Sequence, residues 1–75
     1  MEFKLKYSEY NSSGAITNIC HYEYFSSADL TENRYYELSN MKQDNGMKMY
    51  KVDLYVETYK YINDPSDFLN KFHVD

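Results

Sequence analysis

The chain has 75 residues, a length that accommodates one small domain spanning 1–75. Its content of 43% hydrophobic residues, with 2 glycines and 1 proline, excludes the composition of a disordered segment. The formal charge of −4 opposes direct nucleic-acid binding, because phosphate attraction dominates such affinity, so a basic protein partner is expected.

Residues 2–10 have the alternation of a half-buried strand. Its apolar side consists of Phe3, Leu5 and Tyr7. The pair Ser13-Gly14 that follows is suited to a two-residue turn, so the chain is expected to return as a second strand. The register set by this turn places the apolar side of the first strand opposite Tyr24, Tyr22 and Cys20.

The second strand, residues 19–25, carries apolar side chains on both faces in this register. One face of this second strand continues the apolar side of the first strand. Its other face holds Ile19, His21, Glu23 and Phe25. Strands with two apolar faces are typical of covered positions. We therefore predict that residues 19–25 form a central or covered strand.

Residues 26–43 fit two secondary structures. Ser26 followed three residues later by Asp29 resembles a capping box, which favours a helix from about Ala28 to about Asn40. The apolar stripe of this helix is sparse and consists of Leu30, Leu38 and Met41. These residues form a continuous stripe along the helix only if Arg34 is counted as a member. The alternative is a strand over 34–42 that turns at Asp44-Asn45-Gly46 and pairs with residues 47–58. We expect the helix, and the sequence leaves the strand open for residues 28–42.

Residues 49–63, MYKVDLYVETYKYIN, have the pattern of one long strand with two unlike faces. The apolar face consists of Tyr50, Val52, Leu54 and Val56. The other face consists of Lys51, Asp53, Tyr55, Glu57, Tyr59 and Tyr61. We expect the first face to lie in the core and the second to contact solvent or a partner.

Residues 64–72 predict a short C-terminal helix. Asp64 is a suitable N-cap, Pro65 is favourable in the first helical position, and one side is apolar through Phe68, Leu69 and Phe72. Together these elements predict an α+β fold. It consists of a small antiparallel sheet of three to four strands, one central helix and a short C-terminal helix.

The sequence contains no recognisable catalytic arrangement. Neighbouring residues on a strand point to opposite faces, so Cys20 and His21 are not expected to act together as nucleophile and base. Asp53 and Glu57 would lie about 13 Å apart along a strand, too far to share a proton. Nucleotide-binding and nucleophile motifs are also absent, and we expect neither an enzyme nor a cofactor.

Four side chains could ligate a metal: Cys20, His21, His73 and Asp75. Their spacing matches no zinc pattern, so no metal site is predicted, although the sequence leaves open whether His21 or His73 binds an ion. Cys20 has no partner for an internal disulfide, and the N-terminal residues resemble neither a signal peptide nor a membrane span. We therefore expect a cytoplasmic location and no membrane association.

Tyrosine is the compositional outlier, with 10 residues. It is enriched in protein interfaces because it offers a large contact area and a polar tip at low entropic cost. Carboxylates two positions apart on a strand are separated by about 6.5–7 Å, close to the spacing of successive phosphates. We predict a partner-binding surface for the basic groove of a nucleic-acid-binding host protein. It consists of Asp53, Tyr55, Glu57, Tyr59 and Tyr61, supported by Glu23, Glu32 and Glu37.

The stretch HYEYFSSADLTENRYYELSN at 21–40 resembles the small phage-encoded inhibitors of uracil-DNA glycosylase in its order of a YEY-containing strand and a capped helix. In size, acidity and lack of enzymatic motifs, the chain also resembles the anti-CRISPR proteins. This resemblance implies a non-catalytic inhibitor, phage-derived and anti-CRISPR-like, that occupies the nucleic-acid-binding surface of a nuclease in the cytoplasm of a host cell. The alternatives are a uracil-DNA glycosylase inhibitor, a structural module that forms a homodimer through the tyrosine face, and a single-strand nucleic-acid-binding domain.

Overall fold

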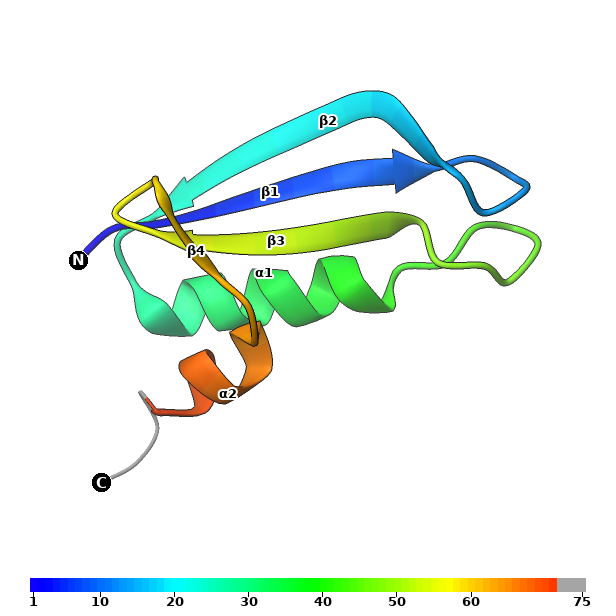
Figure 1. Cartoon of the computed structure of the whole chain (residues 1–75). Coiled ribbons are helices and arrows are strands. Elements are labelled where there is room, and N and C mark those ends of the chain that lie inside the picture. The colour runs from blue at the N-terminus through cyan, green and yellow to red at the C-terminus, as the bar shows by residue number, and fades with distance from the viewer. Residues whose placement is uncertain (72–75) are drawn as a thin grey trace.

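The computed structural model describes residues 1–71, which form one antiparallel sheet of four strands and two helices (Figure 1). In chain order the elements are β1 (Phe3–Tyr10), β2 (Ile16–Phe25), α1 (Ala28–Asn40), β3 (Tyr50–Val56), β4 (Lys60–Ile62) and α2 (Pro65–Asn70). The strands are ordered β2-β1-β3-β4, so β1 and β3 are central and β2 and β4 form the edges. The predicted α+β fold, with one long helix and a short C-terminal helix, is confirmed.

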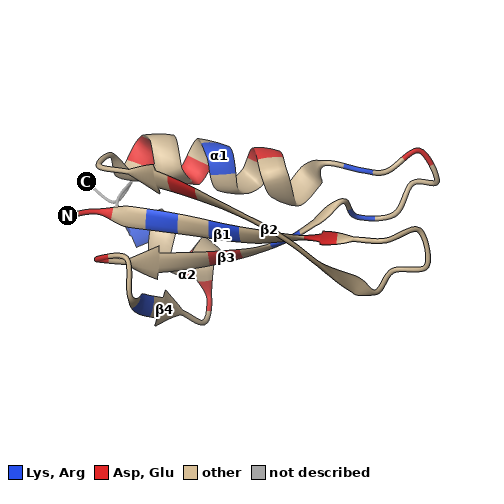
Figure 2. Ribbon diagram, turned by 90° about the horizontal axis from the view of Figure 1, so that it is seen from above, with Lys and Arg blue, Asp and Glu red and all other residues tan. Residues whose placement is uncertain are grey.

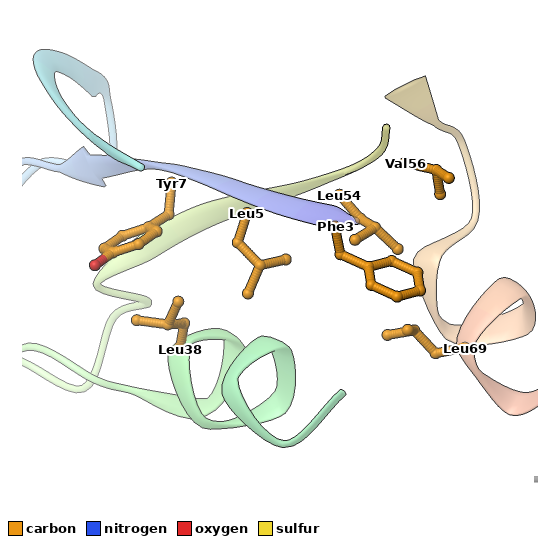
Figure 3. Close-up of a cluster of buried hydrophobic side chains, with 7 residues drawn as sticks. All are labelled: Phe3, Leu5, Tyr7, Leu38, Leu54, Val56 and Leu69. Carbon is orange, nitrogen blue, oxygen red and sulfur yellow. The ribbon is translucent and has the colours of Figure 1, made fainter. Parts of the chain in front are cut away.

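The core lies between the central strands and the helices (Figure 3). It contains the alternating apolar residues of β1 and β3, one leucine from α1 and one from α2. Its buried members are Phe3, Leu5, Tyr7, Leu38, Leu54, Val56 and Leu69. Burial of a leucine or phenylalanine side chain stabilises a fold by roughly 1.5–3 kcal/mol, so these few contacts supply most of the hydrophobic stabilisation.

The helix prediction for α1 is confirmed, and the alternative strand over 34–42 is wrong. The N-cap is Ser27, one residue after the predicted one, and its hydroxyl accepts a hydrogen bond from the N–H of residue 30 at 3.3 Å. Thr31 and Leu38, two turns apart, form the buried side. Leu30, a member of the predicted apolar stripe, precedes the buried Thr31 by one residue. Its side chain therefore lies off the buried side of the helix and is 59% exposed.

The register between β1 and β2 differs by one residue from the predicted one. Tyr7 lies opposite His21 instead of Cys20, and Leu5 lies opposite Glu23. Because successive side chains of a strand point to opposite faces, a shift of one residue exchanges the two faces of β2. The side chains that consequently lie on the face away from α1 are Cys20, Tyr22 and Tyr24.

Two local features cause this shift. The connection is a loop over residues 11–15 rather than a two-residue turn, and the Asn11 side chain stabilises it by accepting two backbone N–H hydrogen bonds, at 2.9 and 3.0 Å. The pairing is also irregular between Ser8 and Tyr10, where extra residues of β2 are accommodated. Moreover, β2 is an edge strand, so its predicted central position is wrong.

The predicted long strand over residues 49–63 is a hairpin. Glu57 and Thr58 have left-handed φ angles of 57° and 65°, and the chain turns back so that β4 pairs with β3. The turn contains no glycine, asparagine or proline, so the sequence does not mark it. The reversal brings Ile62 beside Leu54, where it packs against the core.

The C-terminal helix α2 begins as predicted. The Asp64 side chain accepts a hydrogen bond from the N–H of Asp67 at 3.2 Å, and Pro65 occupies the first turn. Leu69 is fully buried, so α2 closes one end of the core. The predicted contribution of Phe72 lies outside the described residues.

Candidate interaction surface

The sheet has one face packed against α1 and α2, and a second face that no helix within residues 1–71 covers. Figure 2 shows blue lysine bands along β1, whereas α1 carries red acidic bands and one blue band. We call the uncovered face the open face. Its members, taken from the strand register, are Lys4, Lys6, Ser8, Cys20, Tyr22, Tyr24, Lys51, Asp53, Tyr55 and Tyr61.

One row of the open face crosses all four strands. Lys4 on β1 lies opposite Tyr24 on β2 and Tyr55 on β3, and Tyr55 lies opposite Tyr61 on β4. Across the strands, in the order β2-β1-β3-β4, the row consists of Tyr24, Lys4, Tyr55 and Tyr61. One lysine therefore lies among three tyrosines. Tyr24 and Tyr61, on the two edge strands, are 63% and 49% exposed and available for contact.

The side chains of this row contact one another, and Lys4 also contacts Tyr22 of the neighbouring row. The Lys4 ammonium lies 4.3 Å from the centre of the Tyr55 ring and 5.6 Å from that of Tyr22. Such a cation–π contact contributes about 0.5–1 kcal/mol at an exposed site. The rings of Tyr55 and Tyr61 meet edge to face with their centres 5.5 Å apart. These contacts restrict the rotamers of the aromatic side chains.

The formal charge of the open face is +2, since Lys4, Lys6 and Lys51 outnumber Asp53. Asp53 lies opposite Lys6, and its carboxylate is 4.0 Å from the Lys51 ammonium. The acidic excess of the chain therefore lies on other surfaces. The open face is aromatic and cationic, whereas the surface predicted from the sequence is aromatic and anionic.

The structure brings only some of the predicted contact residues together. Asp53, Tyr55 and Tyr61 share the open face. Glu57 and Tyr59 lie in the turn after β3, and Tyr59 is 80% exposed there. The alternating anionic strand face over residues 49–63 does not form, because the chain reverses at that turn.

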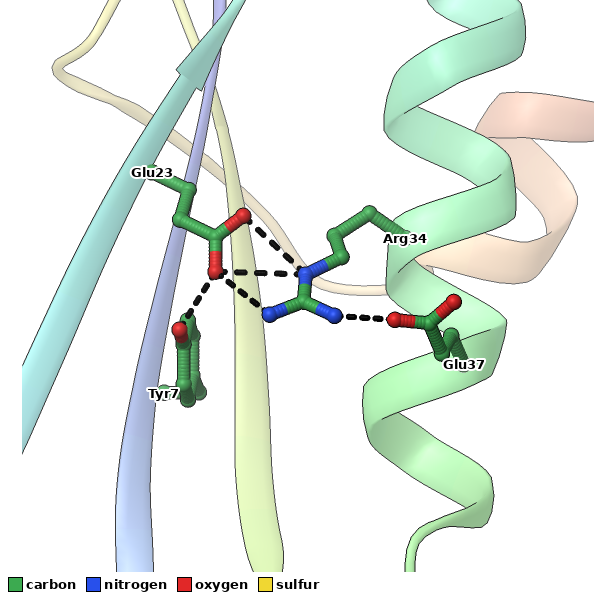
Figure 4. A network of polar contacts seen from close by, with 4 residues as sticks. All are labelled: Tyr7, Glu23, Arg34 and Glu37. Atoms are coloured by element: carbon green, nitrogen blue, oxygen red, sulfur yellow. Dashed lines mark hydrogen bonds and ion pairs between the residues drawn. The ribbon is translucent and has the colours of Figure 1, made fainter.

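The three supporting glutamates lie elsewhere. Glu32 and Glu37 are on α1, and Glu23 is on the face of β2 that is turned toward α1. Glu23 and Glu37 bind Arg34 (Figure 4). Because these two carboxylates already have a cationic partner within the chain, they stabilise the packing of α1 on the sheet rather than extend the open face.

Glu23 is the centre of a polar network that joins β1, β2 and α1. The guanidinium group of Arg34 donates to it at 3.0 Å through Nε and at 2.9 Å through Nη2, and the Tyr7 hydroxyl also donates to it. Arg34 holds the pKa of Glu23 below its ordinary value. Burial raises the pKa of Tyr7, and the hydrogen bond to Glu23 adds to the increase.

His21 belongs to a separate contact group beside this network. Its Nε2 lies 2.8 Å from a Glu9 carboxylate oxygen, and its ring stacks on Tyr7 with the ring centres 5.0 Å apart. Cys20, its neighbour in sequence, points to the open face opposite Ser8, so the two side chains are on opposite faces as predicted. Within residues 1–71 no three potential metal ligands cluster, while His73 and Asp75 lie outside that range.

Sequence reasoning missed the aromatic and charged members of the open face on β1 and β2, which are Lys4, Lys6, Tyr22 and Tyr24. The alternation of residues 2–10 already places Lys4 and Lys6 on one side of β1. The erroneous register assigned the two tyrosines to the core, which concealed that they share a face with these lysines. The one local signal for a longer connection is Asn11, whose side chain organises the loop over residues 11–15.

Neither helix in the part of the chain that the structure describes is long and apolar enough to cross a membrane. Within residues 1–71, the open face gathers aromatic and charged side chains in register across the four strands. Comparison of the chain with protein-family models, with curated proteins and with solved structures gave no match.

Proposed function

We propose that the protein is a non-catalytic protein-binding module and that the open face is its contact surface. The observation that carries this proposal is the gathering of Tyr22, Tyr24, Tyr55 and Tyr61 with three lysines on a sheet face without a covering helix. Tyrosine anchors with a polar tip are the residues that protein interfaces favour. The role that follows is to cover a surface of another protein, as an inhibitor does.

The charge of the open face defines the chemistry of the partner. Lys4, Lys6 and Lys51 surround the single carboxylate of Asp53, so an acidic protein surface is complementary to it. The basic groove that the sequence predicted as the partner would meet three like charges here. An inhibitor that acts through the open face would therefore bind an acidic surface of a nuclease or glycosylase. It would block the nucleic-acid groove of that enzyme sterically.

A protein fits this face better than a single nucleic-acid strand does. Bases need uncovered ring faces on which to stack. The Lys4 ammonium already lies over the rings of Tyr55 and Tyr22, and the Tyr61 ring meets Tyr55 edge to face. The hydroxyl groups and ring edges that remain accessible suit hydrogen bonds and side-chain packing instead. The net charge of −4 further opposes nucleic acid.

Site-specific photocrosslinking in host cells tests the proposal. A photoreactive benzoylphenylalanine in place of Tyr61 samples the open face, and the same group in place of Leu30, which is 59% exposed on α1, samples the helix side. We expect one defined host protein to be trapped by the Tyr61 variant and not by the Leu30 variant. The trapped protein is then purified and its affinity for the unmodified chain is measured.

The outcomes separate the candidate functions. Binding of the purified partner that weakens as salt rises supports the proposal, because exposed lysines contribute through screened attraction. Trapping at Leu30 alone overturns it. Tight binding of an oligothymidylate probe at low salt, with no trapped protein, assigns the open face to single-stranded nucleic acid and also overturns it.

A further inference from the structure

The outer edge of β2 is an unpaired strand edge. β2 is the last strand of the sheet on its side, and within residues 1–71 nothing pairs with its outer backbone groups. Exposed edges of natural sheets are usually protected by lysine, proline, very short strands, bulges or inward-pointing charges. In β2 the irregularity lies before Cys20, and the inward-pointing Glu23 is paired with Arg34. β2 is ten residues long and contains neither lysine nor proline. Such an edge is a template for pairing with another strand.

Exposed apolar side chains gather on the same strand. Ile16, Ile19, Tyr22 and Tyr24 are 53%, 52%, 51% and 63% exposed. The edge is also sterically accessible, because α1 packs mainly on β3 and β1 and least on β2. A strand added beside residues 19–25 would cover Ile19, Tyr22 and Tyr24 without displacing an element of the described residues.

We propose that a second copy of this chain pairs with β2 in antiparallel orientation along residues 19–25, with the two-fold axis at Tyr22. A two-fold axis perpendicular to the sheet leaves every side chain on its own face, so residues that lie opposite each other must point to the same face. The axis therefore lies between the two copies of one residue, and that residue is opposite itself. Residues 20–25 pair regularly with β1, and the irregularity of β2 lies before them. The segment available for flat pairing is therefore centred close to Tyr22.

The side chains are self-complementary in this register. Ile19 lies opposite the partner's Phe25, Cys20 opposite the partner's Tyr24, and His21 opposite the partner's Glu23. The two Tyr22 side chains meet at the axis on the open face. Apolar residues thus meet apolar or aromatic ones, while His21 and Glu23 keep their own partners, Glu9 and Arg34, within each chain.

The neighbouring axes are less favourable. An axis at Glu23 would place the two Glu23–Arg34 ion pairs directly opposite each other and so crowd like groups together. An axis at His21 would place each Glu23–Arg34 ion pair opposite the partner's Ile19, so a polar group would meet an apolar side chain. The axis at Tyr22 avoids both, which is why the sequence of β2 selects it.

The dimer would be one continuous sheet of eight strands with both helix layers on the same side. It adds burial to a domain of 75 residues, a size at which a single core gives marginal stability. The two open faces would lie side by side and form one larger surface. The pairing uses backbone groups of β2 and does not depend on the proposed function of the open face.

Sedimentation equilibrium of the wild-type chain is the first test. We expect a mass of about twice the 9.1 kDa of the chain, falling toward 9.1 kDa on dilution. Tyr22→Lys places two ammonium groups opposite each other and should abolish the dimer while the circular dichroism spectrum stays unchanged. A mass of 9.1 kDa at every concentration of the wild-type chain overturns the proposal.

Cysteine crosslinking tests the register. In a Cys20→Ser background, Tyr22→Cys should form an intermolecular disulfide rapidly, since directly opposite Cα atoms are about 4.5–5.5 Å apart, within disulfide reach. Tyr24→Cys in the same background is the matched control on the same strand face. Its partner cysteine would lie about 13 Å farther along the strand, so no disulfide is expected.

Two results contradict this geometry. Equal crosslinking of the Tyr22→Cys and Tyr24→Cys variants, or a wild-type dimer with no Tyr22→Cys crosslink, places the interface elsewhere. A dimer formed through the open face itself is recognised by its dissociation in the Tyr61→Ser variant, because Tyr61 is on β4, the opposite edge of the sheet. The β2 dimer retains its association in that variant.

Discussion

Arg34 on α1 and Glu23 on β2 form a bidentate ion pair, with Nε and Nη2 of the guanidinium group 3.0 and 2.9 Å from the two carboxylate oxygens. Both side chains are 29% exposed, so the pair is partly shielded from water. Forked guanidinium–carboxylate pairs are stronger and more directional than single contacts. This pair therefore fixes the position of α1 on the sheet and leaves the opposite face uncovered.

Replacement of Glu23 by glutamine should destabilise the fold by about 1–2 kcal/mol at neutral pH, because Arg34, which is partly shielded from water, loses one of its two charged acceptors and keeps only Glu37. The pKa of Glu23 is lowered in the folded state, chiefly by Arg34. Its stabilisation is therefore fully present above the ordinary glutamate pKa and is lost as the pH falls through the lowered value. Urea unfolding of both proteins at neutral and acidic pH measures the difference.

Comparison of the unfolding free energies at neutral and acidic pH separates the effect of the charge from that of packing. The free energies of unfolding of the wild type and Glu23→Gln should converge once the pH is below the lowered pKa. A difference that persists unchanged in acid would show that the variant is destabilised by packing and not by the loss of charge.

Tyr7→Phe isolates the hydroxyl contact. Tyr7 is 7% exposed, and its hydroxyl group donates to Glu23 from within the core. Removal of the donor should cost about 0.5–1.5 kcal/mol of unfolding free energy. Tyr24→Phe, on the open face at 63% exposure, is the matched control and should change stability by less than about 0.5 kcal/mol. Equal effects of the two substitutions would contradict the buried position of the Tyr7 hydroxyl.

The corrected face of α1 can be checked with two leucines of the same helix. Leu38→Ala should destabilise by about 2–5 kcal/mol, because Leu38 is 1% exposed and its removal leaves a cavity against β1. Leu30→Ala removes the same atoms from a side chain that is 59% exposed and should change stability by about 0.5 kcal/mol or less. Chemical denaturation of both variants decides which leucine faces the core.

The turn between β3 and β4 stores backbone strain. Thr58 is β-branched and has a φ of 65°, a region that costs an L-residue roughly 1–2 kcal/mol and glycine much less. Thr58→Gly should therefore raise the unfolding free energy by about 0.5–1 kcal/mol. Tyr59→Gly, one residue later and without a positive φ, should give no such gain. A destabilising effect of Thr58→Gly would indicate that residues 57–59 do not turn as described.

Much of the fold could be predicted from local patterns. The alternation of residues 2–10 and the Asp64-Pro65 start of α2 depend on neighbours in sequence and agree with the structure. The alternation of the predicted strand over 49–63 agrees with it only from Tyr50 to Val56. These features are set by side-chain period and capping, which act within a few residues.

The register of β2 and the reversal at Glu57 could not be predicted in the same way. The register depends on a five-residue loop and on an irregularity that becomes necessary only when both strands are placed together. The reversal is favoured by the packing of Ile62 on the core, a distant contact that outweighs the strain at Thr58. Because the open face depends on that register, its composition followed from the structure and not from the sequence.

Charge reversal at two lysines tests the role of the open face most directly. Lys6 is a member of that face, opposite Tyr22 and Asp53, whereas Lys60 on β4 lies opposite Val56 and outside it. The affinity of the photocrosslinked partner is measured by titration calorimetry for the wild type, Lys6→Glu and Lys60→Glu. We predict a loss of about tenfold or more for Lys6→Glu and little change for Lys60→Glu, because only the first places a carboxylate against an acidic partner. Undiminished binding by Lys6→Glu, or an equal loss in both variants, would contradict the account.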